Sequence, residues 1–329
     1  MSSVLVTGGT GVIGSWVTRQ LVDQGMKVVS YSQPLETTLI EDILDKVDLV
    51  AGDILDLPAI INTIKHYGVE RIIHMAAVLP DTLDANPFMA YRVNVDGTMN
   101  ILEAARLMDI KRVVYTSTMG VYDGAQGEHA YPTYKPIDED YPKAPNSIYG
   151  ATKFFAENMA LSYQHLYGLD VVITRFAMVY GPGKQARHGT LALHSKIIES
   201  AMLGKPLKIP QGRDEMQDMI YVRDIANGLV LACFAENLEH RVFHIATGKG
   251  DTYQHLIEIL DKIFGAVPIE IGPGLNPLGI PSLSRFYFVF NIDRARRELG
   301  YSPQYDLETA TKDYIETMKR FHITPVVPP

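Results

Sequence analysis

The sequence contains a single cysteine and no long hydrophobic run. Cys233 is the one cysteine among 329 residues, which excludes an intramolecular disulfide. Because it lies in the apolar segment GLVLACFAE, we expect it to act as a small buried hydrophobic side chain. The 47% of residues that are apolar form runs well below the roughly 18 consecutive apolar residues of a membrane-spanning helix. We therefore expect a globular protein with a sizeable core and no membrane partner.

The sequence also lacks a cluster of positive charge. Its 30 Lys and Arg are scattered and are outnumbered by 38 Asp and Glu, which gives a formal net charge of −8. A nucleic-acid partner is not expected, because no basic stripe is available to neutralise a phosphate backbone. The first residues, MSSVLVTGG, lack the basic segment and apolar core of a signal peptide, so a cytoplasmic location is expected. The 10 histidines are scattered as well, and no spacing predicts a metal site.

What the sequence does contain is a regular alternation of short β-branched runs and helical patterns. The runs VLVTG, KVVSY, LVAGD, RIIHMAA, RVVYTST and DVVITRF alternate with helices predicted up to about residue 24 and over 57–67, 91–108 and 148–167. This order predicts a parallel sheet covered on both faces, a Rossmann-type doubly wound α/β domain over residues 1–180. Residues 181–329 are predicted to form a smaller, mostly helical region that caps the ligand-binding edge of the sheet, and we assign substrate binding to it. The strand predicted at 242–246 could return to the main sheet.

A glycine-rich turn joins the first strand to the first helix. The segment VLVTGGTGVIG spaces three glycines as GxxGxxG. Such glycines allow a tight turn, close approach of the backbone to a pyrophosphate, and close packing of helix on strand, with the helix N-terminus facing the anion. This position favours a dinucleotide site over a purely structural turn. The residues predicted to bind the dinucleotide here are Gly8, Gly11, Val12, Ile13 and Gly14.

The sequence has no acidic residue at the end of the second strand, where such domains normally bind the adenosine ribose hydroxyls. Ser32 stands there, and no Lys or Arg follows before Lys46, so a cation for a 2′-phosphate is absent as well. Ser32 can hydrogen-bond a hydroxyl, so NAD is favoured over NADP, although both remain open. Asp53 and Ile54, in the segment AGDI, are predicted to clasp the adenine; alternatively, Asp53 caps the next helix.

The stretch SIYGATKFFAEN places Tyr149 and Lys153 four residues apart, on one face of a predicted helix. By itself this pair is equally compatible with an ordinary amphipathic surface. It belongs, however, to a series of segments that reads, in chain order, TGGTGVIG, GDI, HMAA, NVDGT, TSTMGVY, YGATK, RFAMVYGPG and YVRDIA. Taken together, these segments resemble the short-chain dehydrogenase/reductase superfamily, and specifically its extended branch of NAD-dependent epimerases and dehydratases.

The resemblance implies that Tyr149 exchanges a proton with the substrate and that Lys153 supports it. A nearby ammonium and a positive nicotinamide ring both favour the phenolate of a tyrosine, whose ordinary pKa is near 10. Lys153 is also expected to hold the nicotinamide ribose. Thr118 matches the residue whose hydroxyl steadies the substrate oxygen, with Ser117 as its alternative if the register shifts by one. The alternative explanation for Thr118 and Ser117 is structural: they are residues of high β-propensity at the end of a strand.

The same resemblance assigns further residues to the cofactor and the substrate. Ala76 and Ala77 are small residues that leave room for the cofactor backbone. Thr116 is also predicted to bind the cofactor. Asn94 matches a residue of the cofactor and proton-relay region, although a helix N-cap would explain it too. His74 is expected to be a satisfied core or cofactor-side histidine. The predicted substrate residues are Thr118, Tyr122, Met178, Arg187 and Gln217.

The chain departs from the family pattern at the positions that bind a nucleotide diphosphate. Met178 stands where members acting on nucleotide sugars usually have asparagine, and Gln217 stands where they have arginine. Arg285 is out of register with the second arginine of that pattern. Losing these contacts would weaken the binding of a dianion. We therefore expect an oxidoreductase that interconverts an alcohol and a ketone on a small hydroxylated substrate, a sugar or a hydroxy acid, by hydride transfer.

Other functions stay open at this point. A UDP-sugar epimerase would have to hold its diphosphate with Lys184, Arg187 or Arg213. A dehydratase normally has an acid and base pair where this chain has Met119 and Gly120, so that subclass is disfavoured. A non-catalytic dinucleotide sensor would be expected to have lost the tyrosine and lysine of YGATK.

The helix predicted over 148–167 carries more apolar residues than one contact with a sheet uses. They are Phe154, Phe155, Met159, Leu161 and Tyr163. Together with the helix at 91–108 they could form the four-helix interface of a homodimer, as the resemblance implies. The alternative is that the capping region buries them.

Overall fold

The computed structural model describes residues 2–79, 86–122, 124–188, 191–281 and 284–326, and only the backbone of residues 187 and 188. Its main element is a seven-stranded sheet in the order β11-β6-β5-β4-β1-β2-β3. All neighbouring strands in this sheet run parallel. The strands are β1 (Ser3–Thr7), β2 (Lys27–Ser32), β3 (Val47–Ala51), β4 (Arg71–His74), β5 (Arg112–Thr118), β6 (Val171–Phe176) and β11 (Val242–Ile245). The predicted Rossmann-type α/β fold is confirmed.

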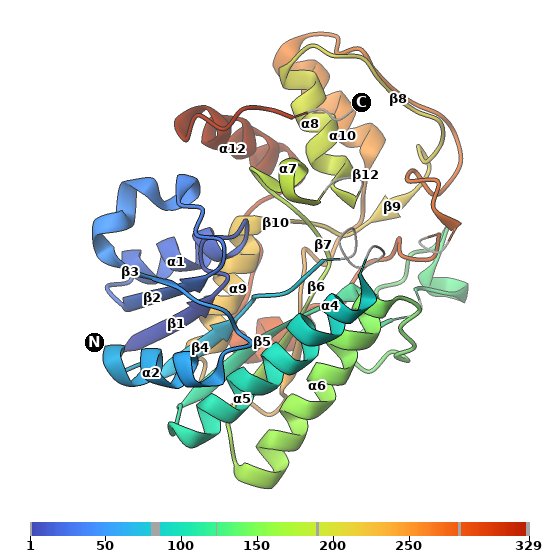
Figure 1. Ribbon diagram of the computed structural model, residues 1–329. Helices are drawn as coiled ribbons and strands as arrows, with labels where there is room; N and C mark the ends of the chain where they lie inside the picture. The colour runs from blue at the N-terminus through green and yellow to red at the C-terminus, as the bar shows by residue number, and fades with distance from the viewer. Residues whose placement is uncertain (1, 80–85, 123, 189–190, 282–283, 327–329) are drawn as a thin grey trace.

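Two layers of helices cover the sheet (Figure 1). On one face lie α1 (Gly14–Asp23) and α9 (Val222–Phe234), and on the other lie α2 (Leu57–Tyr67), α5 (Gly97–Leu107) and α6 (Ile148–Tyr167). Along β1, Val4 and Val6 pack in the first of these layers and Leu5 packs in the second. Both faces of the strand are therefore apolar, which explains why its sequence is a continuous hydrophobic run.

The boundaries of α6 follow from its end residues. The Ser147 side chain caps the N-terminus by accepting the Gly150 N–H, and Gly168 ends the helix in the left-handed conformation at φ +71°. The helix predicted over 91–108 is instead divided. It consists of α4 (Pro87–Tyr91), a π-helical turn η2 (Arg92–Asp96) and α5.

A smaller region, built mainly by the chain after β6, lies above the carboxyl edge of the sheet (Figure 1). Its strand pairs are β7 (Met178–Tyr180) with β10 (Met219–Tyr221), β8 (Leu207–Ile209) with β13 (Ile269–Ile271), and β9 (Met216–Gln217) with β12 (Asp251–Thr252). Its helices are α7 (Lys184–His188), α8 (Leu193–Met202), α10 (Tyr253–Phe264) and α12 (Leu307–Arg320), whereas α11 (Asp293–Leu299) packs against β11 and α9 of the main sheet. Between α9 and α10 the chain crosses back, and β11 pairs with β6 in the main sheet.

Short 3-10 turns complete the described chain: η1 (Thr38–Lys46), η3 (Met119–Val121) and η4 (Gly127–His129). Cys233 is free and fully buried in α9, as expected. Within the described ranges, no helix combines the length and the apolar composition needed to cross a membrane.

Candidate active site

A pocket of about 710 Å³ opens at the carboxyl edge of the main sheet. Most of its wall is formed by residues that end or follow strands β1 to β6, because the C-termini of parallel strands lie at one edge of the sheet, and α4, η2 and α6 complete the wall. The structure brings most of the predicted cofactor and catalytic residues together on this wall. They are Gly8, Gly11, Val12, Ile13, Gly14, Ser32, Asp53, Ile54, Ala76, Ala77, Thr116, Tyr149 and Lys153.

The glycine turn between β1 and α1 has no room for side chains. A Cβ atom on Gly14 would lie 2.0 Å from the Gly8 carbonyl oxygen, and Gly8 itself has φ +70°. A Cβ atom on Gly8 would lie 3.3 Å from the backbone nitrogen of Ala76. The first turn of α1 is thus held close to the loop after β4, and its N-terminus borders the pocket, where backbone N–H groups attract anions.

At the end of β2, the pocket wall contains Ser32 and Glu36. The Ser32 hydroxyl accepts the Thr10 N–H at 3.2 Å and keeps its own proton for a ligand. Asp53, on the next strand end, accepts the Leu55 N–H at 2.9 Å, so it stabilises a turn and also lines the pocket. Among the described wall residues, the acidic ones are Glu36 and Asp53 and the one Lys or Arg is Lys153.

Tyr149, Lys153 and Thr118 meet where α6 begins beside the end of β5. The Thr118 hydroxyl forms a hydrogen bond with Tyr149 and also accepts the Gly120 N–H at 3.1 Å. A Cβ atom on Gly150 would lie 2.0 Å from the Gly120 carbonyl oxygen, so the helix start packs directly on this turn. The neighbouring Ser117 lines the pocket, and its buried hydroxyl has no hydrogen-bond partner within the described part of the chain.

Burial shifts the pKa values of the two titratable groups of this trio in opposite directions. It raises the pKa of Tyr149 to about 12, and the hydrogen bond from Thr118 opposes this shift. Burial lowers the pKa of Lys153 to about 7, and the carboxylate of Glu157, one helical turn further along α6, opposes that shift. The Lys153 ammonium also lies 4.3 Å from the centre of the Tyr115 ring, a cation–π distance. Additional positive charge beside Tyr149 would favour its phenolate.

Glu157 belongs to a buried ion pair that sequence reasoning missed. Arg175 donates to both of its carboxylate oxygens, at 3.0 and 2.7 Å, and the two side chains are 4% and 2% exposed. Arg175 also donates to the Tyr122 hydroxyl at 2.8 Å and to the Glu139 carbonyl. The sequence feature that could have identified Glu157 is its position four residues after Lys153, on the same face of the helix.

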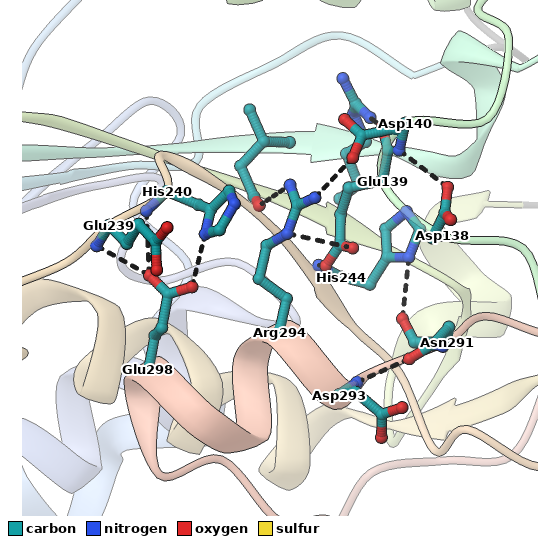
Figure 2. A network of polar contacts seen from close by, with 12 residues as sticks. Asp138, Glu139, Asp140, Glu239, His240, His244, Asn291, Asp293, Arg294 and Glu298 are labelled. Carbon is teal, nitrogen blue, oxygen red and sulfur yellow. Dashed lines mark hydrogen bonds and ion pairs between the residues drawn. The ribbon is translucent and has the colours of Figure 1, made fainter.

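Tyr122, predicted as a substrate residue, is fully buried in this network and does not line the pocket. Its hydroxyl lies 2.6 Å from His244 Nε2. Figure 2 shows the adjoining contacts, in which the His244 N–H donates to Glu139 and Arg294 bridges to Glu139 and Asp140.

Asn94 and His74 support the loop that follows β4. The Asn94 amide accepts the Val78 N–H at 2.8 Å and donates to the Val78 carbonyl at 3.0 Å, so it shapes the wall without lining the pocket. His74 is buried between the hydroxyls of Thr7 and Thr98, at 2.7 and 3.0 Å. Burial, followed by the field of Lys153, lowers the pKa of His74 to about 3, which keeps it neutral.

Two further predicted substrate residues, Met178 and Gln217, lie outside this pocket. Met178 is partly buried on β7, and Gln217 is 1% exposed and donates to the Tyr253 hydroxyl at 2.6 Å. The Arg187 side chain lies outside the described residues. Of the other possible diphosphate anchors, Arg213 donates to the Ile271 carbonyl through two nitrogens, and Lys184 donates to the Val179 carbonyl.

Comparisons with known proteins agree with this architecture. A model of the NAD dependent epimerase/dehydratase family matches residues 4–246. The chain is 32% identical to a UDP-glucose 4-epimerase of Mycolicibacterium smegmatis over 318 residues, covering 95% of this chain and 97% of that protein. A solved structure of a Thermus thermophilus UDP-glucose 4-epimerase in complex with NAD is 25% identical in sequence and superposes with a TM-score of 0.81. The match covers 96% of this chain and 99% of that one. The fold is also similar to that of a Thermotoga maritima UDP-glucose 4-epimerase with UDP-glucose, at 24% identity, TM-score 0.83, and coverage of 97% and 99%.

Proposed function

The chain belongs to the NAD dependent epimerase/dehydratase family, and from that membership we propose a specific activity: the NAD-dependent interconversion of a secondary alcohol and a ketone on a small hydroxylated substrate. The predicted resemblance to extended short-chain dehydrogenases/reductases is confirmed, and the chain is an enzyme of that type. The observation that carries the proposal is the meeting of Tyr149, Thr118 and Lys153 beside the glycine-turn pocket.

The pocket fits a dinucleotide. Its glycine turn lets the first turn of α1 pack against the loops after β1 and β4, which side chains on Gly8 and Gly14 would prevent, and the N-terminus of α1 offers N–H groups to a pyrophosphate. Ser117, on the same wall, has a buried hydroxyl without a hydrogen-bond partner among the described residues. NAD, when bound there, supplies a hydride acceptor at C4 of its nicotinamide ring.

The proposed proton acceptor is Tyr149. With a pKa raised to about 12 by burial, its phenol is a weak base unless positive charge is close. Lys153, held over the Tyr115 ring and near Glu157, supplies part of that charge, and a cationic nicotinamide ring would supply more. Thr118, already bonded to Tyr149, would hold the substrate oxygen while Tyr149 takes its proton.

NAD is proposed over NADP on electrostatic grounds. The wall around Ser32 contains two carboxylates, Glu36 and Asp53, and the described wall residues include no Lys or Arg at that end. A 2′-phosphate dianion would be repelled there, whereas ribose hydroxyls can donate to a carboxylate.

The proposal of a small substrate rests on the state of the possible diphosphate anchors. Arg213 donates to the Ile271 carbonyl, Gln217 carries no charge, and Lys184 alone offers a single positive charge against the two negative charges of a diphosphate. Each charge-assisted contact to a diphosphate contributes roughly 1.5–3 kcal/mol, so a site without them would bind a nucleotide sugar weakly.

A second candidate is a nucleotide-sugar epimerase. It is favoured by the similarity of the chain to UDP-glucose 4-epimerases. The same trio of residues would perform the oxidation and its reversal, and the diphosphate would have to be held by Arg187 or by rearranged side chains.

One experiment separates these candidates. The purified protein is incubated with NAD and, separately, with UDP-glucose, free sugars and hydroxy acids, while the absorbance of reduced nicotinamide and the products are followed. Net reduction with a free sugar or hydroxy acid supports the proposal. Conversion of UDP-glucose to UDP-galactose without net reduction contradicts it and establishes the second candidate.

We also propose a homodimer. Large apolar side chains are exposed on three adjacent helices: Phe88, Met89 and Tyr91 on α4, Leu107 on α5, and Ile148, Phe155, Leu166 and Tyr167 on α6. Four of the residues expected at the interface, Phe154, Met159, Leu161 and Tyr163, are partly buried against the protein core instead. A contiguous apolar surface on helices is typical of a protein interface.

A further inference from the structure

The smaller region contains a buried lysine with no acidic partner. Lys184, the first residue of α7, is 8% exposed, and its ammonium donates to the Val179 carbonyl on β7. Within the described part of the chain, no carboxylate forms an ion pair with it. Burial lowers the pKa of Lys184 to about 7, and no neighbouring negative charge opposes that shift. A buried ammonium without a counter-charge destabilises the folded state, which makes a structural role a poor explanation.

Two further buried side chains nearby have unused hydrogen-bonding atoms. His194, on α8, is 1% exposed and stacks on the Tyr180 ring at 5.4 Å. Its Nε2 atom has no partner within the described residues, and the field of Lys184 contributes to the lowering of its pKa to about 3. Gln217, on β9, is likewise buried, and its Oε1 has no partner among the residues that the structure describes.

The hydroxyl of Tyr253 joins these groups into one cluster. It accepts the Gln217 amide N–H at 2.6 Å and lies 3.4 Å from His194 Nδ1. Lys184, His194, Gln217 and Tyr253 therefore converge from four elements, α7, α8, β9 and α10, that are far apart in the chain. The cluster is joined to the active-site edge by the chain itself: β7, which provides Val179 and Tyr180 to the cluster, begins two residues after Phe176, which lines the cofactor pocket.

The chemistry of the cluster selects one class of ligand. A single buried ammonium matches the single charge of a carboxylate, whereas a nucleotide diphosphate requires more positive charge than Lys184 offers. The unpaired atoms of His194 and Gln217 can pair with a hydroxyl beside that carboxylate. An uncharged sugar would leave the ammonium without a counter-ion.

We infer that Lys184, His194 and Gln217 form a subsite for the carboxylate end of the substrate, so that the substrate is a hydroxy acid or sugar acid. This inference rests on the proposed function, because the alcohol of the same molecule has to reach Tyr149. It narrows the class of possible substrates from small hydroxylated molecules in general to those that carry a carboxylate.

The test compares acids with matched neutral polyols: glycerate, xylonate and gluconate against glycerol, xylitol and sorbitol. The variants are Lys184→Met, which removes the charge at similar volume, and His194→Phe, which keeps the stacked ring. Lys205→Met, at an exposed lysine of the same region, is the control. Measurements are thermal stabilisation in the presence of NAD, NAD affinity, and KM where reduced cofactor forms.

The wild-type protein should be stabilised by at least one acid and not by its polyol. Lys184→Met should weaken this acid by roughly ten- to a hundredfold, with NAD affinity unchanged. The same variant should melt at the same temperature as the wild type or higher without ligand, which a structural lysine would not do. His194→Phe should weaken the acid as well, and the control should change neither property.

Two results would overturn the inference: acids that bind no better than their polyols, or acid binding that Lys184→Met changes less than twofold. Failure of the proposed function looks different. In that case an acid would stabilise the protein through Lys184, but no substrate of either kind would give Tyr149-dependent reduction of NAD.

Discussion

Replacing Glu157 by Gln should destabilise the protein strongly, although the substitution removes only one charge. Its carboxylate accepts two hydrogen bonds from Arg175, and both side chains are almost inaccessible, at 2% and 4% exposure. The variant would leave a buried guanidinium facing a neutral amide. Breaking a buried ion pair in this way costs about 3–5 kcal/mol. Because Gln keeps one acceptor, and Arg175 keeps its bonds to Tyr122 and Glu139, we expect the lower end of this range.

The chain contains a matched control. Glu103 pairs with Arg106 in a similar two-bond geometry, at 2.9 and 2.6 Å, but these side chains are 31% and 34% exposed. Glu103→Gln should therefore cost about 1 kcal/mol or less. Urea denaturation of the wild type and of both variants, followed by circular dichroism, measures the two losses. A loss for Glu157→Gln no greater than that of the control would refute the argument from burial.

The same substitution should also change the pH dependence of turnover. Glu157 opposes the lowering of the Lys153 pKa, so its removal takes that pKa below about 7. Less of Lys153 is then protonated above neutral pH, and the Tyr149 phenolate loses support. Activity should fall more at pH 8 than at pH 6, and an equal loss at both values would argue against this coupling.

The remaining predictions concern cofactor choice, pH and assembly. Glu36→Lys should raise the ratio of kcat/KM for NADP to that for NAD by at least roughly tenfold, which corresponds to one charge-assisted contact; an unchanged ratio would show that the ribose is recognised elsewhere. Burial lowers the Lys184 pKa from 10.5 to about 7, so between these values the unfolded chain binds more protons and stability should rise with pH. Denaturation midpoints at pH 7 and 9 should show a steeper rise for the wild type than for Lys184→Met, and parallel rises would contradict the assignment. Phe155→Glu places a charge among the exposed apolar side chains of α6 and should convert a dimer into monomers in light scattering; a wild type that is already monomeric refutes the proposed interface.

Much of the fold could be predicted because its signals are local. The limits of α6 agree with the predicted helix at 148–167, since Ser147 caps its start and Gly168 ends it. The parallel sheet followed from buried β-branched runs separated by helices. The helix α11 was missed, because it is short and its sequence, DRARREL, is mostly charged and gives no clear apolar stripe.

The site was predictable only where residues lie close to a strand end or share one helix face. The pocket wall collects the glycine turn and Ser32, which are positioned by the ends of parallel strands, and Tyr149 and Lys153, which share one face of α6. Tyr122 follows such a strand end too, but it turns into the core because Arg175 and His244 offer it two buried hydrogen bonds. The cluster around Lys184 brings together residues from four separate elements, and the spacing of residues in the sequence does not predict such a contact.

The central claim is that Tyr149 handles the substrate proton in an NAD-dependent oxidation. The most direct measurement compares the wild type with Tyr149→Phe, by the rate of reduced nicotinamide formation and by the dissociation constant of NAD. The variant should lose turnover by roughly a hundredfold or more while its NAD affinity stays within about twofold. Turnover that survives the substitution would contradict the account.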